Sequence, residues 1–345
     1  MCNEYHHMLT APPSFFSVLL LLLLCGCGPA PRNEVIVYAS LDREFSEPIL
    51  HEFETETKIT VAAKYDVEST KTVGLTNAIV QESAKPRCDL FWNNEILNTI
   101  RLEKRGLLET FSPPNAAAVP ESFRSPRQRY YGFAARARVL LVNTELTKDE
   151  EPTSIRDLTA EKWRGKCGFA KPLAGTTATH AAVLFATWGD AKAAAFFKAA
   201  IANGSVFSGN KQVAEAVGRG QIAFGLTDTD DAIIEVEAGR PVKIVFPDQE
   251  ANGLGALFIP NTLCIVKNGP NTEAAKKLAD FLLRPEIEAR LAEGPSAQIP
   301  ILASGDARKT SRVEPPAPVK WMAADFATAE AKWEVAGQTL RDLLP

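Results

Sequence analysis

Residues 35–63 read VIVYASLDREFSEPILHEFETETKITVAA, and this stretch contains the pattern that decides the fold. Residues 35–40 are β-branched and almost wholly apolar, as in a strand that is buried on both faces of a parallel sheet. The apolar residues of 42–53 recur at helical spacing, and residues 59–63 form a second apolar run. A strand, a helix and a strand in this order predict a βαβ unit.

The same alternation continues along the chain. Further strands are predicted at 88–92, 138–143, 166–170, 222–226 and 257–266, and helices at 72–82, 96–107, 177–188, 191–202, 211–219, 273–283 and 286–293. Such alternation is typical of open, doubly wound sheets, and a chain of this length favours two lobes over one compact core. We therefore expect an α/β fold in which two doubly wound sheets are joined by crossing strands.

An export signal is predicted at the N-terminus. The largely apolar run at 15–24 ends in six leucines and is about half the roughly 20 residues that span a membrane. Leu24-Cys25-Gly26-Cys27 follows, which is the pattern that a lipoprotein signal peptidase cleaves. Cys27 is therefore the expected site of lipidation, with Cys25 as the alternative. An ordinary secretory signal is the competing interpretation, because no Lys or Arg precedes the apolar run.

The predicted division of the chain follows from this signal and from the strand pattern. Residues 1–26 form the signal peptide and 27–34 a tether. The first lobe comprises 35–131 and 259–310, and the second lobe comprises 132–258 and 311–345. The expected location is the periplasm or the cell-envelope surface, where the N-terminal lipid attaches the protein to the membrane.

Charge and cysteine content exclude several classes of protein. The formal net charge is −4 and the isoelectric point is about 5.8, so no basic surface is expected for nucleic acid. Cys88, Cys167 and Cys264 are odd in number and widely spaced. This spacing favours buried thiols over a zinc site or a disulfide framework, although one disulfide stays open.

Polar segments follow three of the predicted elements in the first lobe, at 40–42, 69–71 and 93–95. Ligands of open α/β sheets bind beyond the carboxyl ends of the strands, so these segments are candidates for ligand contacts. The alternative for each segment is a helix cap or a turn. The candidate residues are Ser40, Asp42, Asn93, Asn94 and Glu95.

The segment KPLAGTT at 171–177 lies between a predicted strand and a predicted helix. Amide groups at the start of that helix, with the two threonine hydroxyls, are suited to an anion, which makes Gly175, Thr176 and Thr177 candidates. A plain helix cap is the alternative. His180, one turn further on, is expected to be a packed or a surface residue rather than a ligand.

The segment DTDD at 228–231 follows the predicted strand 222–226. Three close carboxylates repel one another unless a cation, an ammonium group or hydroxyl donors compensate them. Asp228, Thr229, Asp230 and Asp231 are therefore candidate ligand contacts. The alternative is the N-terminus of a helix, with Asp228 or Thr229 as its cap.

Arg136 precedes the predicted strand 138–143 and is a candidate partner for a carboxylate or phosphate in the cleft, with a salt bridge between the lobes as the alternative. No nucleophile elbow, His-Glu-x-x-His pair or dinucleotide fingerprint occurs in the sequence. The sequence therefore argues against an enzyme, and no cofactor is expected.

Six stretches of the chain, in this order and spacing, resemble a known family. They are VIVYASLDREFSEPILHEFETETKI (35–59), CDLFWNNE (88–95) with RLEKRGLLE (101–109), GFAARARVLLVN (132–143), EKWRGKCGFAKP (161–172), SGNKQVAEAVGRGQIAFGLTDTDD (208–231) and AAKKLADFLLRPEIEARLAEG (274–294). The family comprises the extracellular solute-binding proteins of ABC importers, and the similarity is strongest to its ferric-iron-binding branch, the type II periplasmic binding proteins.

This resemblance implies two α/β lobes that close on a ligand and present it to an ABC permease and its ATPase. The ligand-contacting segments of the family correspond to 40–42, 93–95, 175–177 and 228–231. Arg136 corresponds to an arginine near the anion of the family, and Asn210 joins the candidate contacts. A monomer is expected.

The sequence departs from the ferric branch where that branch carries a Tyr-Tyr pair, because Asp230 and Asp231 stand there, and Val142 stands where some members place another tyrosine. Carboxylates are hard oxygen donors, as phenolates are, but they also suit divalent cations, amines and sugar hydroxyls. The resemblance implies Fe³⁺ or another metal as the transported ligand, held by Asp230 and Asp231. A phosphorylated sugar, a phosphonate or a polyamine is the alternative, as is a role as a ligand sensor.

Overall fold

The computed structural model describes Met1 and residues 33–66, 72–148, 150–302, 312–313, 315 and 318–344. The predicted export signal, Cys27 and residues 69–71 lie outside the described residues. Among the helices that are described, none has the length and apolar character needed to cross a membrane.

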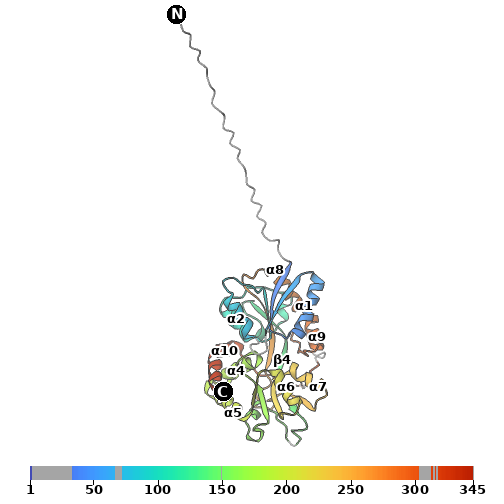
Figure 1. The fold of residues 1–345 in the computed structure, drawn as a ribbon. Coiled ribbons are helices and arrows are strands. Elements are labelled where there is room, and N and C mark those ends of the chain that lie inside the picture. The colour runs from blue at the N-terminus through green and yellow to red at the C-terminus, as the bar shows by residue number, and fades with distance from the viewer. Residues whose placement is uncertain are drawn as a thin grey trace. The chain divides into compact units, whose positions relative to one another are not determined.

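Strands and helices alternate through most of residues 33–345, which form one compact unit (Figure 1). The strands are β1 Glu34–Ala39, β2 Thr60–Tyr65, β3 Leu90–Asn93, β4 Tyr130–Asn143, β5 Cys167–Ala170, β6 Ser205–Phe207, β7 Phe224–Asp228, β8 Val242–Val245 and β9 Phe258–Ile265. The helices are α1 Arg43–Thr57, α2 Val73–Gln81, α3 Leu97–Lys104, α4 Gly175–Trp188, α5 Asp190–Asn203, α6 Asn210–Gly218, α7 Thr229–Glu237, α8 Thr272–Leu282, α9 Pro285–Glu293, α10 Phe326–Ala331 and α11 Trp333–Leu343.

The described strands form one sheet in the order β2-β1-β3-β9-β4-β7-β5-β6, and β8 also pairs with β4. Strands β2, β1 and β3 are parallel to one another, as are β7, β5 and β6. We call these two sets the first half and the second half of the sheet. Antiparallel β9 and β4 join them, which confirms the predicted α/β fold with parallel strands linked by crossing strands.

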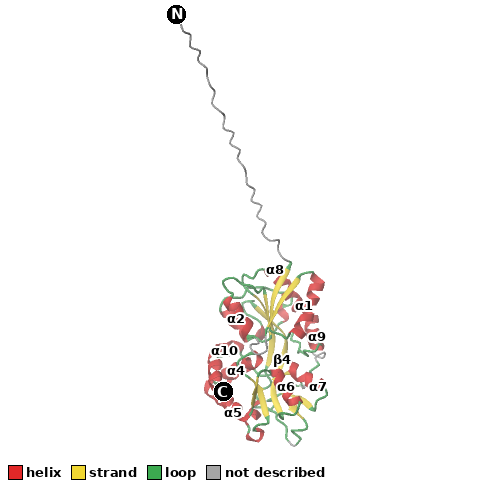
Figure 2. Cartoon of the chain, viewed as in Figure 1, coloured by secondary structure: helices red, strands yellow, loops and turns green. Residues whose placement is uncertain are grey.

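Strand β4 is longer than predicted and begins at Tyr130 rather than at Arg138. Its first part pairs with β9, and its last part pairs with β7 and β8, so that it belongs to both halves of the sheet (Figure 2). The register against β9 shifts between Phe133 and Ala135, which marks a β-bulge at Ala134. The residue boundaries of the two lobes stay a prediction.

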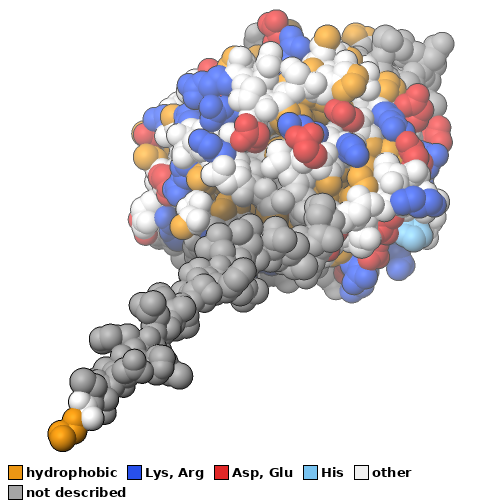
Figure 3. All heavy atoms as spheres, turned by 90° about the horizontal axis from the view of Figure 1, so that it is seen from above, with side chains coloured by type: hydrophobic (Ala, Val, Ile, Leu, Met, Phe, Trp, Pro, Cys, Tyr) orange, Lys and Arg blue, Asp and Glu red, His pale blue; other side chains and the backbone are white. Residues whose placement is uncertain are grey.

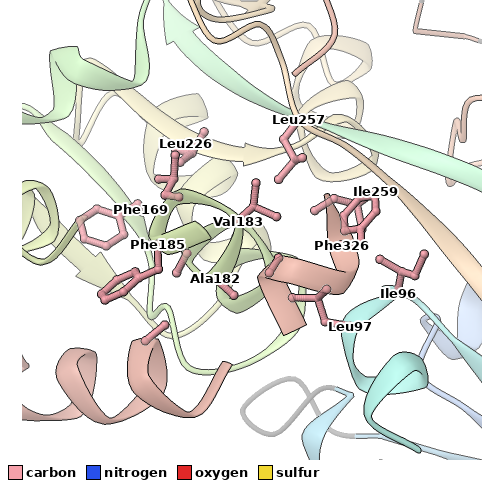
Figure 4. Packing of buried hydrophobic residues seen from close by; sticks show 14 of the residues in the cluster. Ile96, Leu97, Phe169, Ala182, Val183, Phe185, Leu226, Leu257, Ile259 and Phe326 are labelled. Atoms are coloured by element: carbon pink, nitrogen blue, oxygen red, sulfur yellow. The ribbon is translucent and has the colours of Figure 1, made fainter. Parts of the chain in front are cut away.

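One hydrophobic cluster extends across both halves of the sheet. Figure 4 shows Leu97 of α3 close to Phe326, the first residue of α10, while Val183 of α4 and Phe169 of β5 belong to the same cluster. There are two further hydrophobic clusters among the described residues. One lies beneath α1, α8 and α9, and the other lies beneath α6 and α7. The apolar spacing of these helices places their buried residues on one side, which explains why the predicted elements form where they do.

The C-terminal helices α10 and α11 were not predicted. They pack against α3, α4 and α5, and Lys104 and Arg101 of α3 form ion pairs with Glu330 and Glu334. The prediction also missed the short strands β6 and β8.

The charges on the described surface and the state of the cysteines agree with what the composition predicted. Figure 3 shows acidic and basic side chains interspersed on the face that it presents, with no field of a single sign among the residues described there. Cys88, Cys167 and Cys264 are all buried free thiols, as the sequence favoured over a disulfide. Burial raises the pKa of the Cys167 thiol to about 11, which keeps it protonated at neutral pH.

Candidate functional site

The candidate site is a small cavity at the carboxyl ends of the strands in the second half of the sheet. Its free volume is about 30 Å³, on a measure for which one water needs about 10–15 Å³. The lining residues come from β4, from the ends of β5 and β7, from the starts of α4, α6 and α7 and the residues before them, and from the segment after β3. They are Asn94, Arg136, Ala170, Lys171, Ala174, Gly175, Thr176, Thr177, Ser208, Gly209, Asn210, Asp228, Asp230 and Asp231.

Asp228 forms the centre of a buried polar network. It lies directly opposite Arg138 in the β4–β7 ladder, and Arg138 donates from Nη1 to its Oδ1 at 2.7 Å. Thr176 and Asn210 donate to the other oxygen, Oδ2, at 2.5 and 2.9 Å. Both partners of the ion pair are at least 98% buried, and these hydrogen bonds replace the solvation that the carboxylate loses.

The same network engages side chains at the starts of α7 and α4 that could otherwise cap these helices. Asp228 precedes α7, but its side chain makes no capping hydrogen bond. Thr177 lies inside α4 and donates to Asn210 Oδ1 at 3.0 Å, and no side chain caps the N-terminus of α4. Asp228 therefore stands at the N-cap position of α7, with Asp230 and Asp231 in the first turn, as the alternative prediction had it. No side chain caps either helix, however, so Thr176 and Thr177 are not plain helix caps.

Gly175 begins α4 at the edge of the cavity, where its φ is +59°. A Cβ atom there meets no atom within 4 Å, so the requirement for glycine is conformational rather than steric. The amide end of this 14-residue helix faces the same cavity as the carboxylates. A helix N-terminus carries a partial positive charge, which favours an anionic group at this edge of the site.

Arg136 is the second buried guanidinium of the site. Its Nε lies 3.5 Å from Asp230 Oδ2, and it donates from Nη2 to Asn261 Oδ1 at 3.3 Å. Burial lowers the pKa of Arg136, but Asp230, then Asp228, Asp42 and Asp231, raise it more, and the net result is above the ordinary value. The cation is therefore held by acids around the cavity rather than by one partner.

Asp228, Asp230 and Asp231 form the acidic cluster of the site. Each contributes one carboxylate oxygen, and these oxygens all lie within 4.8 Å of one another. Asp230 is buried, whereas Asp231 is partly exposed. Thr229 adds no charge to the cluster. Its hydroxyl oxygen accepts a hydrogen bond from the amide of Ala137, and this bond connects α7 to β4. The backbone amide of Asp231 donates to Asp230 Oδ1 at 3.1 Å.

The candidate residues of the first half are buried but are mostly engaged elsewhere. Glu95 accepts hydrogen bonds from the amides of Leu97 and Asn98 at 2.6 and 2.9 Å, so its carboxylate satisfies the start of α3. Asn93 and Thr179 also donate to Glu95. A ligand contact for this carboxylate stays a prediction, and in the structure it serves the start of α3 and a hydrogen bond from α4.

Ser40 follows β1, Asn93 is the last residue of β3 and Asn94 follows it, and all three are buried. The oxygens Ser40 Oγ, Asn93 Oδ1 and Asn94 Oδ1 have no hydrogen-bond partner among the described residues. Of these residues only Asn94 lines the cavity. Asp42 precedes α1 and acts electrostatically on Arg136, which places it near the site without lining the cavity.

His180 packs behind the cavity, as predicted. It lies one turn into α4, beside an apolar space that Phe169 and Phe197 also line. Burial, with a further contribution from Arg138, lowers the pKa of His180 to about 3. The imidazole is therefore neutral throughout the physiological range.

The prediction missed Asn261, Ser208 and Gly209. It did not name Arg138 and Lys171 as contacts, although they stand in the stretches 136–138 and 171–177 that were predicted to bind. Arg138 carried a signal, because it stands two positions from Arg136 and alternate residues of a strand share a face. Asn261 lies on β9, more than 100 positions from Arg136, and only the pairing of β9 with β4 brings the two together.

Comparison with known proteins places the chain in a family. The family described as bacterial extracellular solute-binding protein matches residues 91–330. The chain belongs to this family. The resemblance seen in the sequence is thereby confirmed, and the predicted class of extracellular solute-binding protein holds.

The relatives of this solute-binding protein include an iron protein and a phosphonate protein. It is 26% identical over 316 residues to iron uptake protein A1 of Synechocystis sp., covering 86% of each chain. It is 28% identical over 192 residues to a putative 2-aminoethylphosphonate-binding periplasmic protein of Salmonella typhimurium, covering 54% of this chain and 55% of that relative.

The fold is similar to that of iron-bound HitA from Pseudomonas aeruginosa. The TM-score is 0.79 at 22% identity, and the match covers 90% of this chain and 99% of HitA. At this identity the likeness concerns the fold alone.

Proposed function

We propose that this solute-binding protein takes up ferric iron together with an accompanying anion outside the cell. Asp230 and Asp231 are the proposed metal ligands. Arg136, Asn94 and the start of α4 at Gly175, Thr176 and Thr177 are the proposed surroundings of the anion. Asp228 and Asn210 are assigned to holding this site together through Arg138 rather than to binding the metal themselves.

The observation that carries the proposal is the acidic cluster at the cavity. Carboxylate oxygens are hard ligands that suit hard cations, and three of them lie within 4.8 Å of one another. Asp228 is engaged by Arg138, Thr176 and Asn210, and Asp230 and Asp231 lie beside it along the lining of the cavity. The donor set therefore fits a small, highly charged cation.

The charges of the site favour an anion beside the metal. The cluster has one more carboxylate than the buried guanidinium groups of Arg136 and Arg138. A trivalent cation bound there leaves the site positively charged unless an anion accompanies it. The N-terminus of α4 and the exposed Lys171 border the same cavity and suit the oxygens of a polycarboxylate. The iron uptake relative supports the same ligand.

Delivery to a membrane permease follows from this proposal. The two lobes, comprising 35–131 with 259–310 and 132–258 with 311–345, are proposed to close on the ligand, and an ABC permease with its ATPase then imports it. Lipidation of Cys27 keeps the binding protein at the membrane. The mass of the mature N-terminal peptide tests whether the anchor is present. Cys27→Ser is expected to prevent acylation, and Cys25→Ser is expected to leave the acylation of Cys27 unchanged.

Ligand-dependent stabilisation tests the iron proposal. The purified protein is heated with ferric citrate, with citrate alone, and with zinc, a phosphosugar, 2-aminoethylphosphonate or spermidine. A ligand at a hundredfold its Kd adds about 2.7 kcal/mol of stability. We expect this gain with ferric citrate, and metal analysis of the complex is expected to find iron.

Two matched pairs of substitutions distinguish an effect of the acids at the cavity from an effect of acids elsewhere on the surface. Asp230→Asn with Asp231→Asn is expected to abolish the gain with ferric citrate. The control pair, Asp190→Asn with Asp342→Asn, removes two acids from exposed or half-exposed positions and is expected to keep it. Stabilisation by an organic solute and not by ferric citrate would instead assign the site to that solute.

A further inference from the structure

The extra residue in β4 controls which way the two site arginines point. Phe133 pairs with Asn261 and Ala135 pairs with Pro260, so Ala134 has no opposite residue on β9. Ala134 is fully buried and has a φ of +37°, which an L residue rarely adopts. Such a bulge changes the phase of every side chain that follows it.

The change of phase is visible in the pairing with β9, where Tyr130 lies opposite Cys264 before the bulge and Arg136 lies opposite Ile259 after it. Tyr130 and Arg136 are six positions apart, whereas their partners on β9 are five positions apart. Beyond the bulge, Ala137 and Val139 pack into the cluster beneath α6 and α7, while Arg136 lines the cavity and Arg138 donates to Thr176 near the start of α4. In a strand without the extra residue, the two sets exchange faces. Both guanidinium groups then enter an apolar core, and the acids of the cavity lose their cations.

Glu288 of α9 holds the bulge in place. Its Oε1 accepts the amide proton of Ala134 at 2.5 Å. The same carboxylate accepts from the amides of Ile301 and Leu302 at 3.1 and 2.7 Å. Ala135 and Ile299 exchange two backbone hydrogen bonds beside it, at 2.8 and 2.7 Å. One fully buried carboxylate and the Ala135–Ile299 backbone pair therefore connect the bulge to residues 299–302.

Asn261 continues the connection from the bulge to the site. Its Nδ2 donates to the carbonyl of Ala134, and its Oδ1 accepts from Arg136. Arg136 in turn reaches Asp230 at 3.5 Å. A continuous series of contacts therefore runs from Glu288 through Ala134 and Asn261 to the acidic cluster.

We propose that Glu288 is a positioning residue for the ligand site, which sets the direction of Arg136 through the bulge at Ala134. This inference rests on the proposed function for its ligand and extends it to a residue outside the cavity. Glu288 touches neither ligand nor cavity, and it works by accepting three amide protons. An amide side chain cannot do the same, because its NH₂ group meets a backbone donor.

The test compares Glu288→Gln with Glu286→Gln, an exposed position on the same helix. In the ligand-free protein, amide hydrogen exchange across 133–138 is expected to be faster in Glu288→Gln and unchanged in Glu286→Gln. Ferric citrate is expected to bind Glu288→Gln about 10–100-fold more weakly, the loss typical of residues that orient a metal site. Glu288→Asp, which keeps the carboxylate, serves if the amide variant does not fold.

A double-mutant cycle distinguishes a positioning role of Glu288 from a general loss of structure in the variant. If Glu288 acts through Arg136, the Arg136→Gln/Glu288→Gln protein binds ferric citrate no more weakly than Arg136→Gln alone. Additive losses overturn the proposal, and so does unchanged exchange across 133–138 in the Glu288 variants. Failure of the unaltered protein to bind ferric citrate overturns the proposed function instead, and the exchange measurement then decides the positioning role.

Discussion

The strand ends of the two halves of the sheet are equally polar but use their polar residues differently. In the first half, Glu95 satisfies the amides at the start of α3. In the second half, Asp228 is satisfied by side chains, from Arg138, Thr176 and Asn210, and the neighbouring acids face a cavity. A polar residue after a strand therefore indicates a binding site only when local backbone donors do not already use it.

Removal of the buried cation of the second half is expected to have the largest effect. Arg138→Met leaves Asp228 buried without its ion-pair partner, which costs about 3–5 kcal/mol of stability. Urea unfolding measures this loss. The control is Arg43→Met, which breaks the exposed Arg43–Glu47 pair of α1 and is expected to cost well under about 1 kcal/mol. Equal losses in both variants would contradict the contrast between the halves.

Acid pH is expected to weaken the second half through His180. The pKa of His180 is about 3 in the folded protein and about 6.5 in the unfolded chain, so between these values only the unfolded chain binds the proton. Stability therefore falls as pH drops through this window, by about 1.4 kcal/mol per pH unit. Unfolding curves from pH 7 to 4 measure it.

The His180→Leu variant is expected to lack this part of the pH dependence. Its free energy of unfolding is compared with that of the unaltered protein at each pH. The control removes His51, whose side chain is 78% exposed on α1. A His180→Leu curve parallel to that of the unaltered protein would show that burial of this imidazole does not control the acid response.

Glu95→Gln sharpens the comparison from the first half. The amide keeps one acceptor oxygen for two backbone donors, so we expect a loss of about 1–3 kcal/mol of stability. Affinity for ferric citrate, measured in the folded protein, is expected to stay unchanged. The control is Glu121→Gln, whose side chain is 93% exposed. A loss of affinity in Glu95→Gln alone would return this residue to the ligand contacts.

The smallest expected effect compares two glycines with similar backbone. Gly175 borders the cavity at φ +59°, and Gly106 follows α3 at φ +71°, each with open space where a Cβ would lie. Alanine at either position is expected to cost about 1 kcal/mol, because the left-handed conformation is strained for an L residue. Only Gly175→Ala is expected to change ligand affinity as well, and calorimetric titration distinguishes the two variants.

Most elements of the fold were predictable because their apolar periodicity is local. Strand β1, helix α1 and strand β2 form within a few residues of the predicted bounds. The first part of β4 was missed because YYGFAARA mixes glycine, alanine and arginine and shows no strand alternation. Its burial depends on β9 and α9, which lie far along the chain. Helix α11 carried an amphipathic signal at Ala336 and Leu340 that went unused.

The sequence by itself determined the class of fold, the family resemblance and the positions of the acids at 228–231. These follow from local periodicity and from residue order, which need no contact between distant segments. Only the tertiary structure decided which acid is neutralised, which strand face carries the arginines and how Glu288 reaches them. The physical reason is that a one-residue bulge and the partners of a buried charge depend on strand register, and register is set by contacts between segments far apart in the chain.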